Sequence, residues 1–103
     1  MTTRTVTGTW LDASRSPHTG SVEFSPSVYV TDTVDDQIVT TKGVTVTLDE
    51  NGSISVDLNT TDDTDISTSG WSWYITERLS GLPNRTWSFE LPDGVGALDL
   101  ADV

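Results

Sequence analysis

An all-β fold is the clearest prediction from this sequence. Short segments in which apolar residues alternate with Thr or Ser run from end to end, as in RTVTGTWL at 4–11, and this period of two is typical of strands with one buried face. Turn-forming residues separate the segments at roughly 8–12-residue spacing, as in sandwiches and barrels. The chain is also poor in the residues that favour helices. We therefore predict a single antiparallel β-sandwich of about seven strands over residues 1–103, immunoglobulin-like or transthyretin-like.

Four strands are predicted in the first half of the chain and a short one at its end. They cover residues 4–11, 21–25, 28–32, 37–41 and part of 97–103. In the first strand, Val6, Gly8 and Trp10 share one face and threonines form the other. Pro26 separates the second strand from the third. Because proline has no N–H to give to a strand ladder, we expect a sheet edge or a bulge there.

A β-hairpin is predicted at residues 44–58, which read VTVTLDENGSISVDL. Apolar residues alternate with Thr before the turn and with polar residues after it, so each half has one apolar face. The Asn51-Gly52 pair between the halves supplies the positive φ angles that a tight hairpin turn needs. We therefore expect the strands on either side of this turn to pair with each other.

A second hairpin is predicted from GWSWYITERL at 70–79 and RTWSFEL at 85–91. A chain with only 34% hydrophobic residues needs its large rings for a core, so we expect a cross-strand aromatic cluster there. The expected core members, by parity, are Trp73, Ile75, Trp87 and Phe89. Tyr74 and Arg78 have the opposite parity, and Trp71 lies at the mouth of the preceding loop. Trp71, Tyr74 and Arg78 are therefore the candidate binding residues.

The charge balance is strongly acidic, with a formal net charge of −11 and only five Lys or Arg residues. Such a surface repels phosphate backbones and anionic membranes, so we expect neither nucleic acid nor a membrane as a partner. The chain has no Cys, which excludes a disulfide framework and thiolate chemistry. The N-terminal MTTRTVTGTW has no apolar run resembling a signal peptide, and no segment reaches the ~20 apolar residues that span a bilayer. We therefore expect synthesis in a cytoplasm.

The segment at 59–69 is an acidic loop and the one candidate metal site. Asp62, Asp63 and Asp65 could supply several of the oxygen ligands that Ca²⁺ takes. The loop has neither the glycine nor the distal Glu of an EF-hand, and short acidic clusters are unspecific. A solvated loop that adds solubility is the favoured interpretation, so we expect no cofactor, with Ca²⁺ kept as the alternative.

Catalytic residues are sparse in this sequence. His18 is the only histidine, so a histidine general base would have to be this residue. No strained nucleophile elbow is present. Glu23, Glu77 and Glu90 lie in predicted strands, where a carboxylate is more often outward-facing or paired with Arg than catalytic. We therefore expect no enzymatic activity, although a glycosidase-like pair of carboxylates can come from any two strands.

Four separated blocks resemble small β-domains in virion proteins of tailed phages, especially phages of actinobacteria. The blocks are TGTWLDASRSPHTGSVEFSPS at 7–27, VTLDENGSISVDL at 46–58, TDDTDISTSGWSWYITERLSG at 61–81 and LPNRTWSFELPDGVGALDLADV at 82–103. They follow the same order as the T-G-T-[aromatic]-x-D, central hairpin, G-W-x-Y and L-D-L-A-D blocks of those domains. The general pattern is also similar to carboxypeptidase-regulatory-like and transthyretin-like sandwiches.

The resemblance implies a non-enzymatic structural protein of a phage virion, made in the host bacterial cytoplasm. Such domains often begin minor tail proteins or fibres, whereas this chain ends directly after its L-D-L-A-D block. It is therefore expected to be an accessory subunit, either tail-associated or a capsid decoration protein, that binds other virion proteins in several copies or as a homo-oligomer. The alternative is a carbohydrate- or host-surface-binding module that uses Trp71, Tyr74 and the 62–65 loop, with Ca²⁺ as an optional aid.

Overall fold

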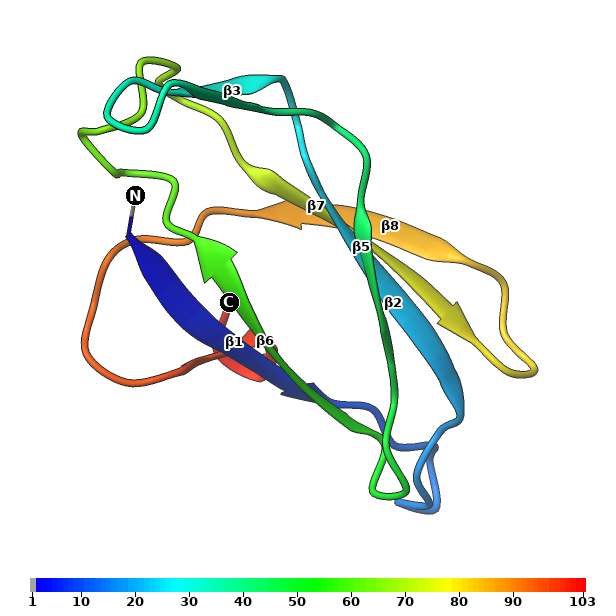
Figure 1. Ribbon diagram of the computed structural model, residues 1–103. Coiled ribbons are helices and arrows are strands. Elements are labelled where there is room, and N and C mark those ends of the chain that lie inside the picture. The colour runs from blue at the N-terminus through cyan, green and yellow to red at the C-terminus, as the bar shows by residue number, and fades with distance from the viewer. Residues whose placement is uncertain (1) are drawn as a thin grey trace.

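The computed structural model describes residues 2–103, and almost all of its regular structure is β-strand (Figure 1). The strands are β1 (Thr3–Thr9), β2 (Gly20–Pro26), β3 (Val30–Asp32), β4 (Gln37–Val39), β5 (Val44–Thr47), β6 (Ser53–Asn59), β7 (Trp73–Leu79), β8 (Arg85–Phe89) and β9 (Leu98–Asp99). A single turn of 3-10 helix, η1 (Leu100–Asp102), follows them. Within these residues no helix is long and apolar enough to span a membrane. The predicted all-β fold is confirmed.

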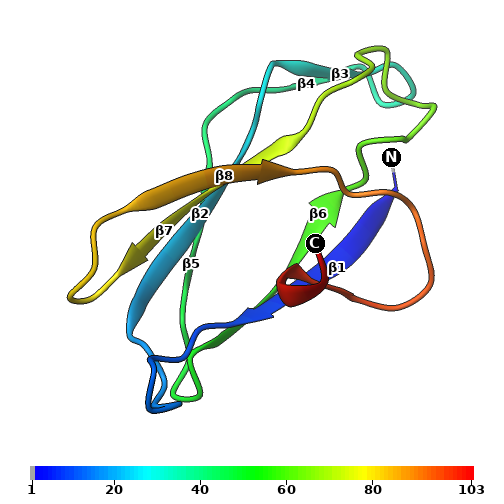
Figure 2. The same cartoon turned by 180° about the vertical axis from the view of Figure 1, so that it is seen from behind.

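Two sheets form the layers of a sandwich. One sheet has the order β6-β1-β9 and the other the order β5-β2-β7-β8, and Figure 2 shows the two layers from behind. A separate two-stranded ribbon, β3–β4, extends from one end. All of the ladders are antiparallel except the short β1–β9 pairing, which is parallel and departs from the prediction. The indole N–H of Trp73 in β7 donates to the Asn59 carbonyl in β6 at 2.9 Å, which links the layers.

The predicted hairpin at 44–58 is wrong, because its two halves belong to different sheets. Strand β5 pairs with β2, with Val46 opposite Val22, and β6 pairs with β1, with Val56 opposite Val6. The tight turn does form, with Gly52 at a φ of 73°, but it carries the chain from one layer to the other. Alternation of apolar residues shows that a strand has a buried face. It does not show which neighbour the strand pairs with, so an arch between sheets has the same pattern as a hairpin.

The second predicted hairpin is confirmed, together with its register. Trp73 lies opposite Phe89 and Ile75 opposite Trp87. Phe89 also packs edge-on against Phe24 of β2, with the ring centres 6.2 Å apart. The buried apolar residues of both layers form one core. The parity argument therefore placed the large rings of β7 and β8 correctly.

The structure also corrects the expectation for Pro26. This residue is the last one in β2, a central strand between β5 and β7, rather than an edge strand. The Gly20 carbonyl accepts from the Leu48 amide at 3.0 Å, so the even-numbered residues of β2 direct their backbone groups toward β5. Strand β5 begins at Val44, opposite Phe24, and therefore does not reach Pro26. The missing N–H of Pro26 costs the ladder no hydrogen bond.

Candidate functional site

The acidic loop between β6 and β7 is tied to the rest of the fold. The Thr33 amide donates to the Asp65 carbonyl at 2.9 Å, and the Ser67 amide donates to the Thr31 carbonyl at 3.0 Å. Between them, Ile66 is buried and forms a bridge with Asp32. The loop therefore extends the β3–β4 ribbon by one irregular strand. The expected description as a solvated loop applies only to its polar side chains.

The carboxylates of this loop hold backbone amides. Asp62 accepts from the Asp93 amide at 3.0 Å, and Asp63 accepts from the amides of Thr2 and of Asp65. The hydrogen bond from Thr2, followed by the one from Asp65, holds the pKa of Asp63 below its usual value. In the described part of the chain, no three His, Cys, Asp or Glu side chains gather as metal ligands would. Calcium binding at this loop stays a hypothesis that this geometry does not favour.

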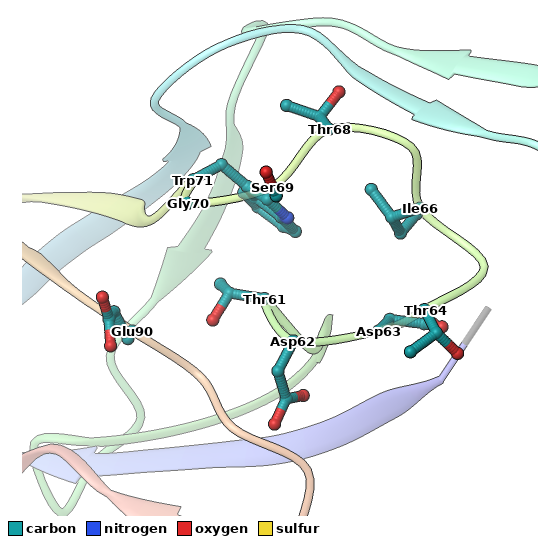
Figure 3. Close-up of a pocket in the computed structure, with 10 residues that line it drawn as sticks. All are labelled: Thr61, Asp62, Asp63, Thr64, Ile66, Thr68, Ser69, Gly70, Trp71 and Glu90. Carbon is teal, nitrogen blue, oxygen red and sulfur yellow. The ribbon is translucent and has the colours of Figure 1, made fainter.

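A pocket of about 390 Å³ opens under this loop, and Trp71 reaches into it (Figure 3). Its lining residues are Thr61, Asp62, Asp63, Thr64, Ile66, Thr68, Ser69, Gly70, Trp71 and Glu90. In Figure 3 the Asp62 carboxylate points away from the indole of Trp71, while Ile66 and Ser69 lie close to the ring. The wall next to the indole is therefore a mixture of apolar groups and short hydroxyl side chains.

Trp71 is a buried residue, with only 3% of its surface exposed. Its ring packs against Trp73 with the ring centres 5.3 Å apart. Two buried side-chain atoms of residues 2–103 lack a hydrogen-bond partner, and they are Trp71 Nε1 and Asp32 Oδ2. By contrast, the indole N–H groups of Trp73 and Trp87 each donate to an oxygen, at 2.9 and 2.8 Å. The Trp71 donor is thus an exception that calls for an explanation.

The other two candidate binding residues lie elsewhere. Tyr74 and Arg78 are on the outer face of β7, where Tyr74 is 44% exposed. Arg78 forms an ion pair with Glu23 of the neighbouring strand at 3.1 Å. The structure therefore does not bring Trp71, Tyr74 and Arg78 into one site. Tyr74 is available at a polar surface, whereas Trp71 belongs to the pocket under the loop.

No family model matches this chain. The search of curated proteins also returns no match. The resemblance to phage virion domains therefore remains a hypothesis that rests on the sequence blocks alone, and function has to be argued from the residues themselves.

Glu77 is a buried carboxylate in β7, which the sequence predicts to be either outward-facing or paired with Arg; it is paired with Arg and faces inward. Arg85 donates to both of its oxygens, at 2.9 and 2.7 Å, and the Trp87 indole donates at 2.8 Å. Burial is the largest single influence and acts to raise the pKa of Glu77. The hydrogen bonds from Arg85, Trp87 and Trp10 and the charge of Arg85 together outweigh it, so the pKa lies below the usual value. Glu77 is thus an ionised structural acceptor.

The possible catalytic residues do not form a pair of carboxylates. His18 lines a second pocket of about 330 Å³, beside Glu77 and Arg85. Glu23 and Glu77 lie on opposite faces of their sheet, because Glu23 is in register with Thr76, the strand neighbour of Glu77. A carboxylate with a lowered pKa is also poorly suited to donate a proton near neutral pH. Glu23 and Glu77 therefore do not face each other as a catalytic pair would, and the absence of enzymatic activity stays a prediction.

The β3–β4 ribbon and its flanks carry an unusual group of exposed apolar side chains. Val28, Tyr29, Val34 and Ile38 are all exposed, and Ile38 is 67% exposed. Ile38 pairs with Thr31, while the neighbouring pair of Val30 and Val39 turns toward the core. The ribbon therefore turns Val30 and Val39 toward the core and leaves Ile38 on its outer face, with Val28 and Tyr29 just before β3 and Val34 in the turn after it. Sequence reasoning missed this group because each member looked like an ordinary strand residue.

Proposed function

We propose that this protein is a non-enzymatic structural protein of a tailed phage virion, an accessory subunit that binds other virion proteins. Labelling of intact particles distinguishes a tail location from a capsid location. The structural observation that carries the proposal is the exposed apolar group on the β3–β4 ribbon. Exposed apolar side chains gathered on one element of a soluble protein commonly mark a contact with another protein.

The chemistry of this ribbon suits a protein partner. Tyr29 supplies a large ring with a polar end, and aromatic residues of this kind are enriched at the centres of interfaces. Ile38 and Val34 add apolar area beside it. The chain carries 16 acidic residues, and two of them, Asp35 and Asp36, are exposed in the β3–β4 turn beside Val34. The apolar group therefore has an acidic neighbour, consistent with the polar rim that surrounds the apolar centre of an interface.

Open sheet edges offer a second means of assembly. At the end of the β1–β6 ladder, the Thr60 amide donates to the Thr2 carbonyl at 3.0 Å, so even-numbered residues of β6 direct their backbone groups toward β1. The odd-numbered Ser55 and Asp57 consequently direct theirs outward, where a partner strand can add. The N-terminal strand does not offer an open edge of this kind. Strand β1 is central in its sheet, and only the two-residue β9 flanks it there.

The location of the protein tests the proposal directly. We expect the chain to copurify with intact particles of the phage that encodes it and to appear in several copies per particle by quantitative mass spectrometry. Labelling of intact particles with an antibody then separates a capsid location from a tail location. Absence of the chain from purified particles contradicts the proposal.

A pair of substitutions tests the role of the ribbon. Ile38→Thr removes apolar area from the proposed contact and keeps a β-branched residue in the strand. We expect roughly tenfold lower incorporation into particles, as for the loss of an interface anchor. Val95→Thr is the matched control, since Val95 is fully exposed in a loop away from the ribbon. Equal incorporation of the two variants would exclude the ribbon as the contact.

A further inference from the structure

We propose that the pocket under the 60–71 loop is a binding site for a neutral sugar ring, and that the indole N–H of Trp71 donates to one of its hydroxyl oxygens. The lining of this site includes neither the exposed apolar group of the ribbon nor the open sheet edge, although Ile66 in its wall bridges to Asp32 of β3. The proposal therefore holds or fails independently of the virion role.

The unpartnered N–H of Trp71 is the observation that points to a ligand. A buried donor without an acceptor has lost its hydrogen bonds to water without replacement, which destabilises the fold, so such groups are rare in folded proteins. Trp71 Nε1 is such a donor, in a side chain that is almost fully buried. Figure 3 shows the ring extending into the space that the loop encloses, with its nitrogen on the side of Ile66. An acceptor that enters this space therefore removes the cost.

The lining groups are complementary to the apolar C–H groups and to the hydroxyl groups of a sugar ring. Ile66 and Trp71 line the pocket with their small exposed portions, and a shift of the loop side chains would widen this apolar wall for the C–H groups of the ring. Thr61 and Ser69 supply hydroxyls, and the Glu90 carboxylate supplies an acceptor. Small-molecule pockets usually have volumes of about 300–1,000 Å³ and combine apolar walls with a few polar groups. The observed volume of about 390 Å³ lies at the lower end of this range.

The charges of the pocket argue against the other simple ligands. Asp62, Asp63 and Glu90 all line it, so an anion is repelled. A bare cation does not satisfy an N–H donor, and Asp62 and Asp63 already accept from backbone amides. A hydroxyl group is both acceptor and donor, so it can accept from Trp71 while another hydroxyl of the same ring donates to Glu90.

Access to the indole nitrogen requires a small movement. Nε1 is covered by neighbouring atoms, so a ligand oxygen reaches it only when side chains of the loop shift. The residues over the pocket are short, with Thr68, Ser69 and Gly70 in sequence before Trp71. Gly70 has a φ of 70° and open space around its Cα, so the backbone is not packed against other groups at this point.

The test follows the four indole N–H signals of the protein by ¹H–¹⁵N NMR during titration with glucose, galactose, mannose and N-acetylglucosamine in turn. We expect at least one sugar to shift the Trp71 signal in a saturable way. The signals of Trp73 and Trp87 are internal references, because both groups already have protein acceptors. Glycerol, calcium chloride and inorganic phosphate are titrated in parallel as competing explanations.

Two variants connect the response to the site. Trp71→Phe keeps an aromatic ring and removes the donor, and we expect roughly tenfold weaker sugar binding, followed by the signals of the loop amides. Glu90→Gln removes the negative charge of the proposed acceptor at an exposed position and should weaken binding while the fold is kept. Glu50→Gln is the matched control, since it removes the same charge from a turn outside the pocket.

Several outcomes overturn the proposal. The first is an unchanged Trp71 signal with all four sugars, and the second is a response to calcium or phosphate alone. An equal response to glycerol shows only a general affinity for hydroxyl groups and also contradicts a sugar site. If Trp71→Phe fails to fold, equal sugar binding by Glu90→Gln and Glu50→Gln decides against the pocket.

Discussion

Glu77 shows how a single charged residue can be accommodated inside a small core. Its carboxylate accepts from Arg85 and Trp87, and Arg85 reaches it from the exposed end of β8. The guanidinium group also lies over the Trp87 ring, 5.8 Å from its centre. A buried charge is tolerated when hydrogen bonds replace its lost hydration. Pairing with Arg was one of the two expectations for Glu77, but only the structure shows that Arg85 and Trp87 together allow it to face inward.

Acid should destabilise the protein, partly through Glu77. A lowered pKa in the folded state contributes stability that is complete above the unfolded value, 4.5 for Glu77, and is lost as pH falls through the lower folded value. Asp12 and Asp63 have lowered pKa values too, chiefly through backbone hydrogen bonds from Ser16 and Thr2. We expect a level melting temperature above about pH 5 and a decline below it.

The Glu77→Gln variant tests how much of the loss of stability in acid comes from Glu77. The variant should lose about 2 kcal/mol at neutral pH, because its bonds to charged Arg85 are weakened. The difference in free energy of unfolding between the variant and the parent protein should narrow as pH falls, because Glu77 of the parent protein then becomes protonated. Denaturant unfolding at a series of pH values measures the difference. A gap that stays constant from neutral to acidic pH would mean that ionisation of Glu77 does not contribute.

At the scale of elements, the arch between β5 and β6 is where sequence and structure diverge. The two strands, the turn and the buried faces were all predictable, because they depend on local alternation and on Asn51-Gly52. The choice of partner was not, because it depends on β1 and β2, which lie far away in the sequence. The pairing of β7 with β8 was predictable, since both strands are close in sequence and their rings match across the ladder.

The arch is held by the side chain of Asp49. Its carboxylate accepts from the amides of Asn51 and Ser53 at 2.8 and 2.9 Å. We expect Asp49→Ala to lower the free energy of unfolding by about 1–2 kcal/mol, as for the loss of a capping side chain. Glu50→Ala in the same turn is the control, with a change within about 0.5 kcal/mol because the residue is exposed. Urea denaturation compares them, and equal losses would argue against the Asp49 bonds.

The candidate sites, too, were predictable only in part. Sequence reasoning located Trp71 at the mouth of the acidic loop, but the depth of the ring depends on the contact of Ile66 with the β3–β4 ribbon. It also identified Tyr74 as an outward residue by parity, and the structure agrees. The exposed group on the ribbon had no signature in the sequence, because exposure there results from a short ribbon that lies outside both layers.

For the whole molecule, unbalanced charge is the main electrostatic property. The chain has 16 acidic and five basic residues, and its side-chain ion pairs within residues 2–103 include only those of Arg78 with Glu23 and Arg85 with Glu77. Most carboxylates therefore repel one another across the surface. Salt screens such repulsion over distances of about 10 Å at 0.1 M ionic strength.

Added sodium chloride should consequently stabilise the protein. We expect the melting temperature to rise between low and moderate ionic strength, followed by circular dichroism. Glu50→Lys replaces one exposed negative charge with a positive one, so the salt dependence of this variant should be smaller. A melting temperature that falls or stays level with added salt would show that repulsion between carboxylates does not limit the stability of the fold.

The central position of β1 has a consequence for the order of folding. Both partners of this strand, β6 and β9, come much later in the chain. Its backbone groups therefore stay solvated until residues 53–59 have been synthesised. Contacts between segments so far apart in sequence slow folding, with times on the order of milliseconds to seconds for β-sandwiches. The threonines of β1 keep the strand hydrated before it pairs.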